Sequence, residues 1–306
     1  MSTRITQSMI SSRVLTDLQD VSSRLSQTQE KLSSGKELTK PSDDPFATSK
    51  ALSLSNDLEG TQQYERTVND AQAWTGMTET TLGSINSAAQ RARALLVQAG
   101  NDTNDTTDRS AIADEIDQLI EQVKGDANAQ YGGQYIMSGG ATTTAPYTVG
   151  GTPPNDSYHG NTGGIYRQIG PGVSVQINTP GASVLGSGAP GDGGLISTLR
   201  TISQHLRSGT TADADSLRTT DLKALDSSLD AVSSARAVNG ATTNRLSSAS
   251  DRLSQLEQST TSLLSDTQDA DMAKTMIDFS MQQTVYQSAL RAGANIVQAS
   301  LLDFLS

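Results

Sequence analysis

The chain has 306 residues, of which 34% are hydrophobic and only 4% aromatic, so we expect an extended helical protein with a thin core. It contains no cysteine, which excludes disulfides and thiolate metal sites, and its net charge of −11 without a basic cluster argues against nucleic acid and anionic membranes as partners. No run approaches the roughly 18 apolar residues of a membrane span, and the N-terminus lacks the apolar region of a secretory signal.

Residues 5–34 predict an amphipathic helix. Its apolar residues recur at intervals of three, four and seven: Ile10, Val14, Leu18, Val21, Leu25 and Leu32. This stripe is typical of a helix that packs against other helices. Gly35 follows and suits the left-handed conformation that ends many helices.

Residues 35–45 predict a turn, because Pro41 and Pro45 cannot both lie inside a helix. Asp43 and Asp44 precede Pro45, an arrangement that suits a capping carboxylate with proline at the first helical position. Paired acids can also perform acid–base chemistry. Adjacent acids at a helix start more often complement the helix dipole, so we interpret these residues as turn and capping residues.

Residues 46–130 predict a long helical hairpin, with a first helix to about residue 99 and a second one with a regular apolar stripe at Ile112, Ile116, Leu119 and Val123. The acidic loop 101–108 joins the two. It does not match a calcium-binding EF-hand, which requires glycine at position six and glutamate at position twelve. Counted from Asp102, those positions hold Thr107 and Ala113.

Residues 131–194 hold most of the 26 glycines and 8 prolines and predict a β-rich insert. Short β-type runs lie at 134–138, 147–149, 165–169 and 173–178, and we expect the insert to face outward and tolerate change. Gly186, Gly188 and Gly191 form a literal G-x-G-x-x-G. Because Pro190 lies inside it and no βαβ unit surrounds it, a flexible loop is favoured over a dinucleotide site.

Residues 195–264 predict returning helices. A short helix carries Ile196, Leu199, Ile202 and Leu206 and ends at Gly209, and a long helix begins at about Ala214. The two histidines, His159 and His205, lie on different elements, and the chain has no nucleophile, phosphate-binding or metal motif. We therefore expect neither an enzyme nor a cofactor.

Residues 265–306 predict a C-terminal helix that begins after Asp269 and Asp271, which we interpret as capping residues. Its main apolar stripe includes Met276, Phe279, Tyr286, Leu290, Val297 and Phe304. A second stripe runs beside it through Ile277, Met281 and Val285. Two adjacent stripes require partners on two sides of the helix.

These patterns predict a mainly α fold, with long antiparallel coiled-coil helices from both termini and a small β-rich insert domain at the far end. Five segments are expected: an N-terminal assembly helix and turn (1–45), a long helical hairpin (46–130), the insert (131–194), returning helices (195–264) and a C-terminal assembly helix (265–306). The stripes of the two terminal helices require further helices that cover them.

Several short motifs occur in a characteristic order: Leu-Ser-Ser-Gly-Lys at 32–36, Lys-Pro-Ser-Asp-Asp-Pro at 40–45, Gly-Gln-Tyr-Ile-Met-Ser-Gly at 133–139, Ala-Arg-Ala at 235–237, Asn-Arg-Leu at 244–246 and Asp-Ala-Asp at 269–271. In these motifs the chain resembles the bacterial flagellins. The turn at 41–45 and the ending Leu-Leu-Asp-Phe-Leu at 301–305 favour the family members that join hook to filament. Phe46 departs from the small residues expected after the turn.

The resemblance implies a structural subunit of the bacterial flagellum, whose terminal helices form coiled coils with neighbouring subunits in a ring or helical polymer. The apolar stripes of the two terminal helices are then the predicted polymer interface. It implies hook-associated protein 1 and flagellin as axial neighbours, a cytoplasmic export chaperone, and the flagellar type III export apparatus. The expected location is extracellular, in the flagellum, after export without a cleaved signal peptide. A main filament flagellin and a secreted coiled-coil scaffold or adhesin are the alternatives.

Overall fold

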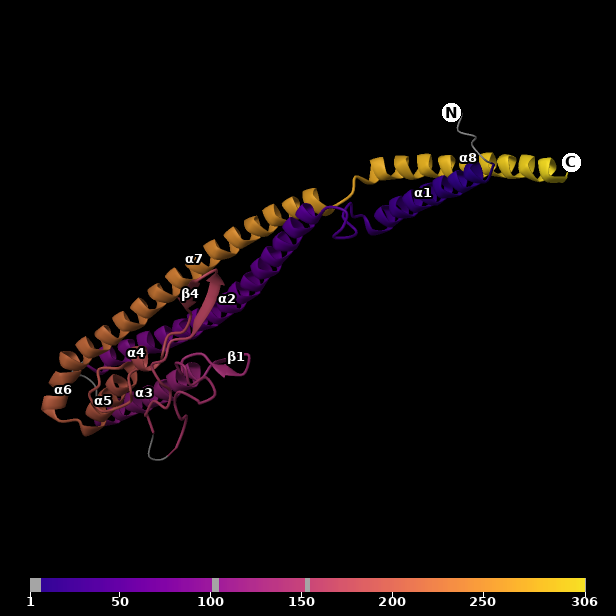
Figure 1. Ribbon diagram of the computed structural model, residues 1–306. Helices are drawn as coiled ribbons and strands as arrows, with labels where there is room; N and C mark the ends of the chain where they lie inside the picture. Colours follow the sequence, from indigo (N-terminus) through magenta and orange to yellow (C-terminus); the bar gives the residue numbers. More distant parts are fainter. Residues whose placement is uncertain (1–6, 101–104, 152–154, 306) are drawn as a thin grey trace. The chain divides into compact units, whose positions relative to one another are not determined.

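The computed structural model describes residues 7–100, 105–151 and 155–305 (Figure 1). The side chains of residues 7, 8, 10, 11 and 295–305 lie outside this description. Contacts divide the chain into two compact units. Unit 1 consists of Met1–Gly60 and Leu256–Ser306, and unit 2 of Thr61–Gln255.

Helices make up most of the described residues. In chain order the elements are α1 (Gln7–Ser34), α2 (Pro45–Ala99), α3 (Thr106–Ala127), β1 (Gln130–Tyr131), β2 (Gln134–Tyr135), β3 (Tyr166–Gly170), β4 (Val173–Gln176), α4 (Ala182–Leu185), α5 (Leu195–Ser208), α6 (Thr211–Arg218), α7 (Thr220–Gln268) and α8 (Met272–Leu305). The mainly α fold, with long helices from both ends and a small β insert, is confirmed.

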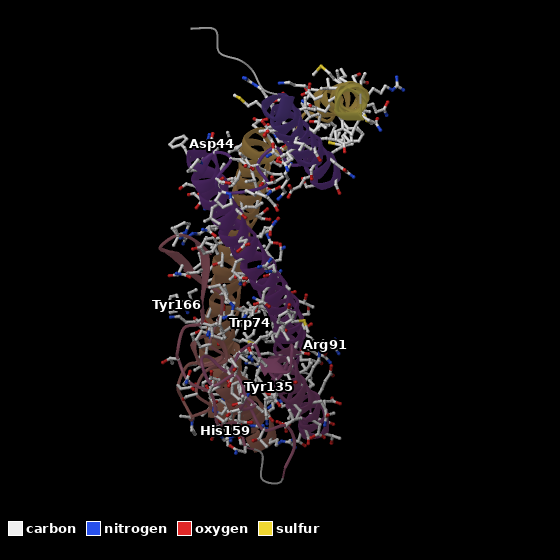
Figure 2. All side chains as sticks on the ribbon, turned by 45° about the vertical axis from the view of Figure 1, so that its right-hand side comes forward. Asp44, Trp74, Arg91, Tyr135, His159 and Tyr166 are labelled. Carbon is white, nitrogen blue, oxygen red and sulfur yellow. The ribbon has the colours of Figure 1, made fainter. Side chains whose placement is uncertain are left out.

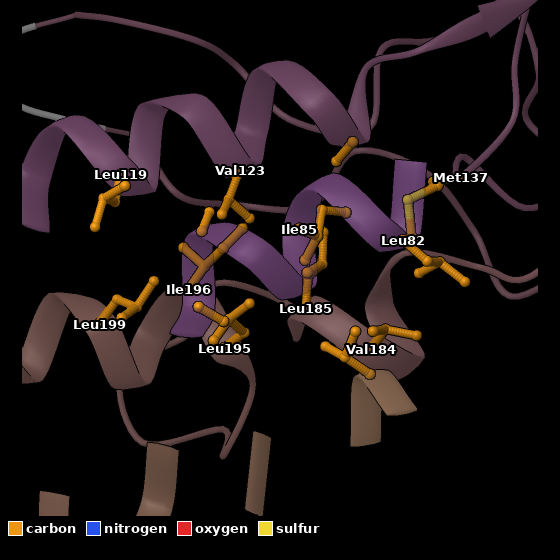
Figure 3. Close-up of a cluster of buried hydrophobic side chains, with 14 of the residues drawn as sticks. Leu82, Ile85, Leu119, Val123, Met137, Val184, Leu185, Leu195, Ile196 and Leu199 are labelled. Atoms are coloured by element: carbon orange, nitrogen blue, oxygen red, sulfur yellow. The ribbon is translucent and has the colours of Figure 1, made fainter. Parts of the chain in front are cut away.

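The hydrophobic core lies in unit 2. Helices α2, α3 and α5 meet there, and Figure 3 shows Ile85, Val123 and Ile196 within the cluster. Trp74 of α2, labelled in Figure 2, is 1% exposed. Its ring contacts that of Tyr131 edge to face, with ring centroids 6.1 Å apart. All members of this core cluster fall between residues 68 and 253. Unit 2 therefore has the packed interior of an independent domain.

The β insert belongs to this core, in contrast to the outward-facing insert that we expected. Strands β1 and β2 pair antiparallel, as do β3 and β4, with Tyr166 opposite Gln176. Five apolar residues of the hairpin and the segment after it are buried in the core cluster: Ile169, Val175, Ile177, Val184 and Leu185. Their alternation extends over too few residues to distinguish a buried hairpin from a surface one by sequence.

The returning helices differ from the prediction at one point. Helix α5 ends at Ser208 and is capped by Gly209, which has a φ of 65°, as predicted. The single long helix expected from Ala214 is divided at Thr219 into α6 and α7. The Thr219 N–H donates to Ser216 O at 3.2 Å and its hydroxyl to Asp215 O at 2.7 Å. These bonds tighten the last turn of α6 and end it.

The five-segment division of the chain stays a prediction. The structure places residues 131–194 in the same compact unit as the helices around them.

Candidate assembly surface

In unit 1, α1 and α8 lie side by side and antiparallel (Figure 1). At one end, the Glu37 N–H donates to Gln268 O at 2.8 Å and the Ala270 N–H donates to Gly35 O at 2.9 Å. Farther along, Gly293 of α8 lies against Val14 of α1. The chain direction therefore reverses between the two helices.

A half-buried seam joins α1 and α8. The predicted interface residues that are half-buried are Val14, Leu18, Val21, Leu25 and Leu32 on α1, and Phe279 and Tyr286 on α8. Gly293 is buried, and a Cβ there would lie 3.2 Å from Val14 Cγ1 and 3.5 Å from Leu18 Cδ1. The absent side chain lets the two helices approach closely. Ile10, Val297 and Phe304 have side chains outside the described residues.

The turn after α1 is held by its own polar groups. Gly35 has a φ of 71°, and its N–H donates to Lys31 O at 2.9 Å. A glycine in the left-handed conformation thus ends α1. Pro41 is exposed, and the nearby Asp43 carboxylate accepts from the Lys40 N–H at 2.9 Å and the Thr39 hydroxyl at 3.1 Å. The Lys40 N–H bond is the main cause that lowers the pKa of Asp43.

Two carboxylates cap helix N-termini in this unit, one at the start of α2 and the other at the start of α8. Asp44 Oδ1 accepts from the N–H groups of Phe46 and Ala47, each at 2.9 Å, and Pro45 is the first residue of α2. Asp271 Oδ1 accepts in the same way from Ala273 and Lys274, at 3.0 and 3.1 Å. Both anions thus satisfy backbone donors at a helix N-terminus.

The Asp269 side chain does not cap α8, in contrast to the capping role that we expected for it. Its carboxylate accepts from the Ser265 hydroxyl at 2.6 Å, and its N–H donates to Ser265 O at 2.9 Å. It lies two positions before Asp271, so its side chain bonds the end of α7 while Asp271 caps α8.

Apolar side chains on α8 remain uncovered on both sides of the seam. On one side Met276 is 56% exposed and Leu290 45% exposed, although both belong to the predicted main stripe. On the other side Ile277, Met281 and Val285 are exposed. At about 100° per residue, these two sets lie on different faces of the helix.

Unit 1 lacks a core of its own among the described residues. Within them, Ala51, 9% exposed, is its one buried apolar side chain, and the core cluster contains none of its residues. Helices α2 and α7 add further exposed apolar side chains to this unit, among them Phe46, Leu52, Leu256 and Leu263. An uncovered apolar surface of this extent is typical of an interaction site.

An ion-pair network in unit 2 was missed by the sequence analysis. Lys124 of α3 is fully buried and contacts Glu121 at 2.6 Å and Asp156 of the insert at 3.1 Å. Arg200 of α5 contacts Asp156 at 2.8 Å and Asp117 at 2.6 Å. Charged residues at 117, 121 and 124 lie on one face of α3, and this spacing was the available signal.

The network sets the ionisation of Asp156. Burial by itself would raise the pKa of this carboxyl, but hydrogen bonds and charge from Arg200 and Lys124 outweigh burial and lower it. Asp156 therefore joins the insert to α3 and α5 as an anion.

The glycine-rich loop with the G-x-G-x-x-G motif contains its own anion. The Asp192 carboxylate accepts from the N–H groups of Gly188 at 3.0 Å and Gly194 at 2.8 Å, and from the hydroxyls of Ser187 and Ser197. Burial opposes ionisation of Asp192, but these hydrogen bonds outweigh it and lower its pKa. The carboxylate occupies donors that a phosphate would need.

The two histidines lie apart. His159 contacts the Thr148 hydroxyl at 3.2 Å, whereas His205 contacts Asp221 at 2.6 Å between α5 and α7. Within residues 7–100, 105–151 and 155–305, no group of three or more His, Asp or Glu side chains is arranged to hold a metal ion. No helix in the described part of the chain is long and apolar enough to span a bilayer.

Comparison with known proteins identifies the class to which this arrangement belongs. The model of the bacterial flagellin N-terminal helical region matches residues 5–142, and that of the C-terminal helical region matches residues 222–305. The chain belongs to the bacterial flagellin family.

Individual relatives within this family include hook-associated proteins and flagellins. The chain is 29% identical to flagellar hook-associated protein 3 of Escherichia coli K12, over 90% of each chain. It is also 29% identical to flagellin of Bacillus subtilis 168, over 99% of each chain. The crystal structure of Bacillus cereus FlgL is similar with a TM-score of 0.58 and 25% identity, and the match covers 70% of this chain and 99% of that one.

Proposed function

We propose that this protein is a structural subunit of the bacterial flagellum that joins the hook to the filament. Its terminal helices would do this by coiled-coil packing against neighbouring subunits. The observation that carries the proposal is the uncovered apolar surface on both sides of α8, in a unit whose described residues contribute nothing to the core cluster. Burial of such surface against other subunits supplies the main free energy of association.

The form of the assembly follows from the position of the uncovered surface. Met276 and Leu290 lie on one side of α8, and Ile277 and Val285 lie on another. One self-complementary patch makes a closed dimer, whereas two different patches allow contacts that continue from subunit to subunit. We therefore propose a ring or a helical polymer of this chain.

The position at the junction is supported by the similarity to hook-associated protein 3 of E. coli and to B. cereus FlgL. The proposed axial neighbours are hook-associated protein 1 and flagellin. We further propose that a cytoplasmic chaperone and the flagellar type III apparatus export the chain, and that it functions outside the cell in a structural, not an enzymatic, role.

A main filament flagellin is the second candidate, favoured by the match to B. subtilis flagellin over 99% of both chains. Electron microscopy of a strain that lacks this protein separates the two candidates. Loss of a junction subunit leaves hooks from which filaments detach, with filament protein still produced. Loss of the main flagellin leaves intact hooks and junctions without any filament protein.

The assembly surface is tested with Leu290→Asp. Full burial of a leucine contributes about 1.5–3 kcal/mol, so the 45% of Leu290 still exposed represents on the order of 1 kcal/mol per subunit. Burying an unpaired carboxylate there costs several kcal/mol more. We expect the urea midpoint of the free chain to stay unchanged and the concentration needed for assembly to rise by at least about 100-fold.

Ser280→Asp is the matched control, because Ser280 is an exposed polar residue on the same helix. At about 100° per residue it lies between the face of Met276 and Leu290 and that of Ile277 and Val285. Ser280 is also four residues from Met276, so the variant places a charge beside the same surface but removes no apolar side chain. Its assembly concentration should therefore rise far less than that of Leu290→Asp. A Leu290→Asp chain that assembles like the wild type would contradict the proposal, as would one that unfolds in its free form.

A further inference from the structure

We propose that the three methionines of α8, Met272, Met276 and Met281, form an oxidation-sensitive site that controls whether the free chain can assemble. This inference rests on the proposed assembly function. The reactant at this site is a peroxide, which oxidises the exposed thioethers before neighbouring subunits cover them.

The first observation is the contrast in accessibility between the methionines of the chain. Met272, Met276 and Met281 are 47%, 56% and 54% exposed, whereas Met137 in the core of unit 2 is 0% exposed. A peroxide must reach the sulfur atom to react, so exposure decides which thioethers are oxidised. In the free chain the α8 methionines are therefore reactive and Met137 is protected.

The second observation is where these side chains lie. Met272 and Met276 are four residues apart, so they occupy one face of α8, together with Leu290. Met281 lies four residues from both Ile277 and Val285, on the other uncovered face. Each of the two faces that we propose for neighbouring subunits thus includes at least one reactive thioether.

The reaction is balanced with a peroxide as the oxidant. The sulfur lone pair attacks one peroxide oxygen, a sulfur–oxygen bond forms, and the oxygen–oxygen bond breaks. For hydrogen peroxide the leaving hydroxide takes up a proton and becomes water. The sulfur is oxidised by two electrons to the sulfoxide and the peroxide is reduced by two.

The product alters the property on which assembly depends. Methionine is flexible and apolar and fills irregular contacts, whereas its sulfoxide is polar and chiral. A sulfoxide that is buried without a hydrogen-bond donor carries the desolvation cost of any unpaired polar group. Oxidation should therefore weaken subunit contacts and leave the folded core of unit 2 intact.

The site is tested first in the full-length free chain with dilute hydrogen peroxide, trypsin and mass spectrometry. The tryptic peptides 253–274 and 275–291 contain the α8 methionines, and 125–167 contains Met137. We expect the two α8 peptides to gain oxygen at least about tenfold faster than the peptide with Met137. Equal rates would overturn the proposal.

The second measurement is the assembly of treated and untreated chains. The wild type should lose assembly after peroxide treatment and regain it after treatment with methionine sulfoxide reductases. The triple variant Met272→Leu, Met276→Leu, Met281→Leu lacks the thioethers and keeps a similar apolar volume. Its assembly is compared with its own untreated level, which peroxide should not reduce. It retains Met9, which is 60% exposed on α1, as an internal control.

Each outcome has a distinct meaning. A wild type that still assembles after complete oxidation of the α8 peptides overturns the proposal, and so does a triple variant that loses assembly on oxidation. If the untreated wild type does not assemble under any condition, the proposed function is wrong. In that case the oxidation rates of the tryptic peptides, measured by mass spectrometry, still decide whether the α8 methionines react faster than Met137.

Discussion

Removal of the Asp156 carboxylate should destabilise unit 2 by about 3 kcal/mol. Asp156 is 11% exposed and accepts from Lys124 Nζ at 3.1 Å and from Arg200 at 2.8 and 3.1 Å. Removing one partner of a buried ion pair costs about 3–5 kcal/mol. The lower end applies, because Lys124 keeps Glu121 at 2.6 Å and Arg200 keeps Asp117 at 2.6 Å.

The assay is urea unfolding of Asp156→Ala followed by tryptophan fluorescence. Trp74 is the chain's single tryptophan and is 1% exposed in the core of unit 2, so its signal reports this unit. At about 2–3 kcal/mol per M urea for a domain of this size, the midpoint should fall by roughly 1 M.

Lys124→Met is the matched comparison. It removes the buried cation, keeps a long apolar side chain, and leaves Asp156 paired with Arg200. Its cost should be smaller than that of Asp156→Ala, because both carboxylates that lose Lys124 keep another partner. Asp156 keeps Arg200, and Glu121, which is 26% exposed, still accepts from the Gly150 N–H. The reasoning is refuted if Asp156→Ala costs under about 1 kcal/mol or if Lys124→Met costs as much.

The pH dependence of this network has a defined sign. Since the folded pKa of Asp156 is lowered, its stabilisation is present above its unfolded value of about 3.9 and is lost as the pH falls through the folded pKa. The difference in urea midpoint between the wild type and Asp156→Asn should therefore be constant from about pH 7 to pH 5 and shrink below about pH 4, and a difference that does not change with pH would contradict this. For the seam between α1 and α8, Gly293→Leu should separate the helices, because its Cβ alone would lie 3.2 Å from Val14. Faster amide hydrogen exchange in α1 should result, although leucine favours helix over glycine, and Ala294→Leu at an exposed position should leave exchange unchanged. Equal exchange in both variants would show that the close approach is not needed.

The long helices could be predicted from sequence because their apolar patterns extend over many residues. The helix expected over residues 5–34 is α1 at Gln7–Ser34, and the one expected from Phe46 to about Ala99 is α2 at Pro45–Ala99. The burial of the insert could not be predicted, because strands of four or five residues give too short a pattern.

The contacts of individual side chains were less predictable. The charged face of α3 has the sequence pattern of a solvated helix surface. The structure shows that it is covered, by Asp156, which lies 32 residues after Lys124, and by Arg200 of α5. On α8, apolar residues occupy several faces, so sequence alone did not show that Phe279 and Tyr286 are half-buried while Met276 and Leu290 are exposed.

The confinement of the core to residues 68–253 has an evolutionary consequence. Substitutions at exposed positions such as Ile277 or Val285 remove no packing from that core, so they leave the folding free energy of unit 2 nearly unchanged. The residues that determine folding and those proposed for contact with neighbours are thus subject to separate selection. A chain of this kind can adapt to a different neighbour through its terminal helices while its fold stays the same.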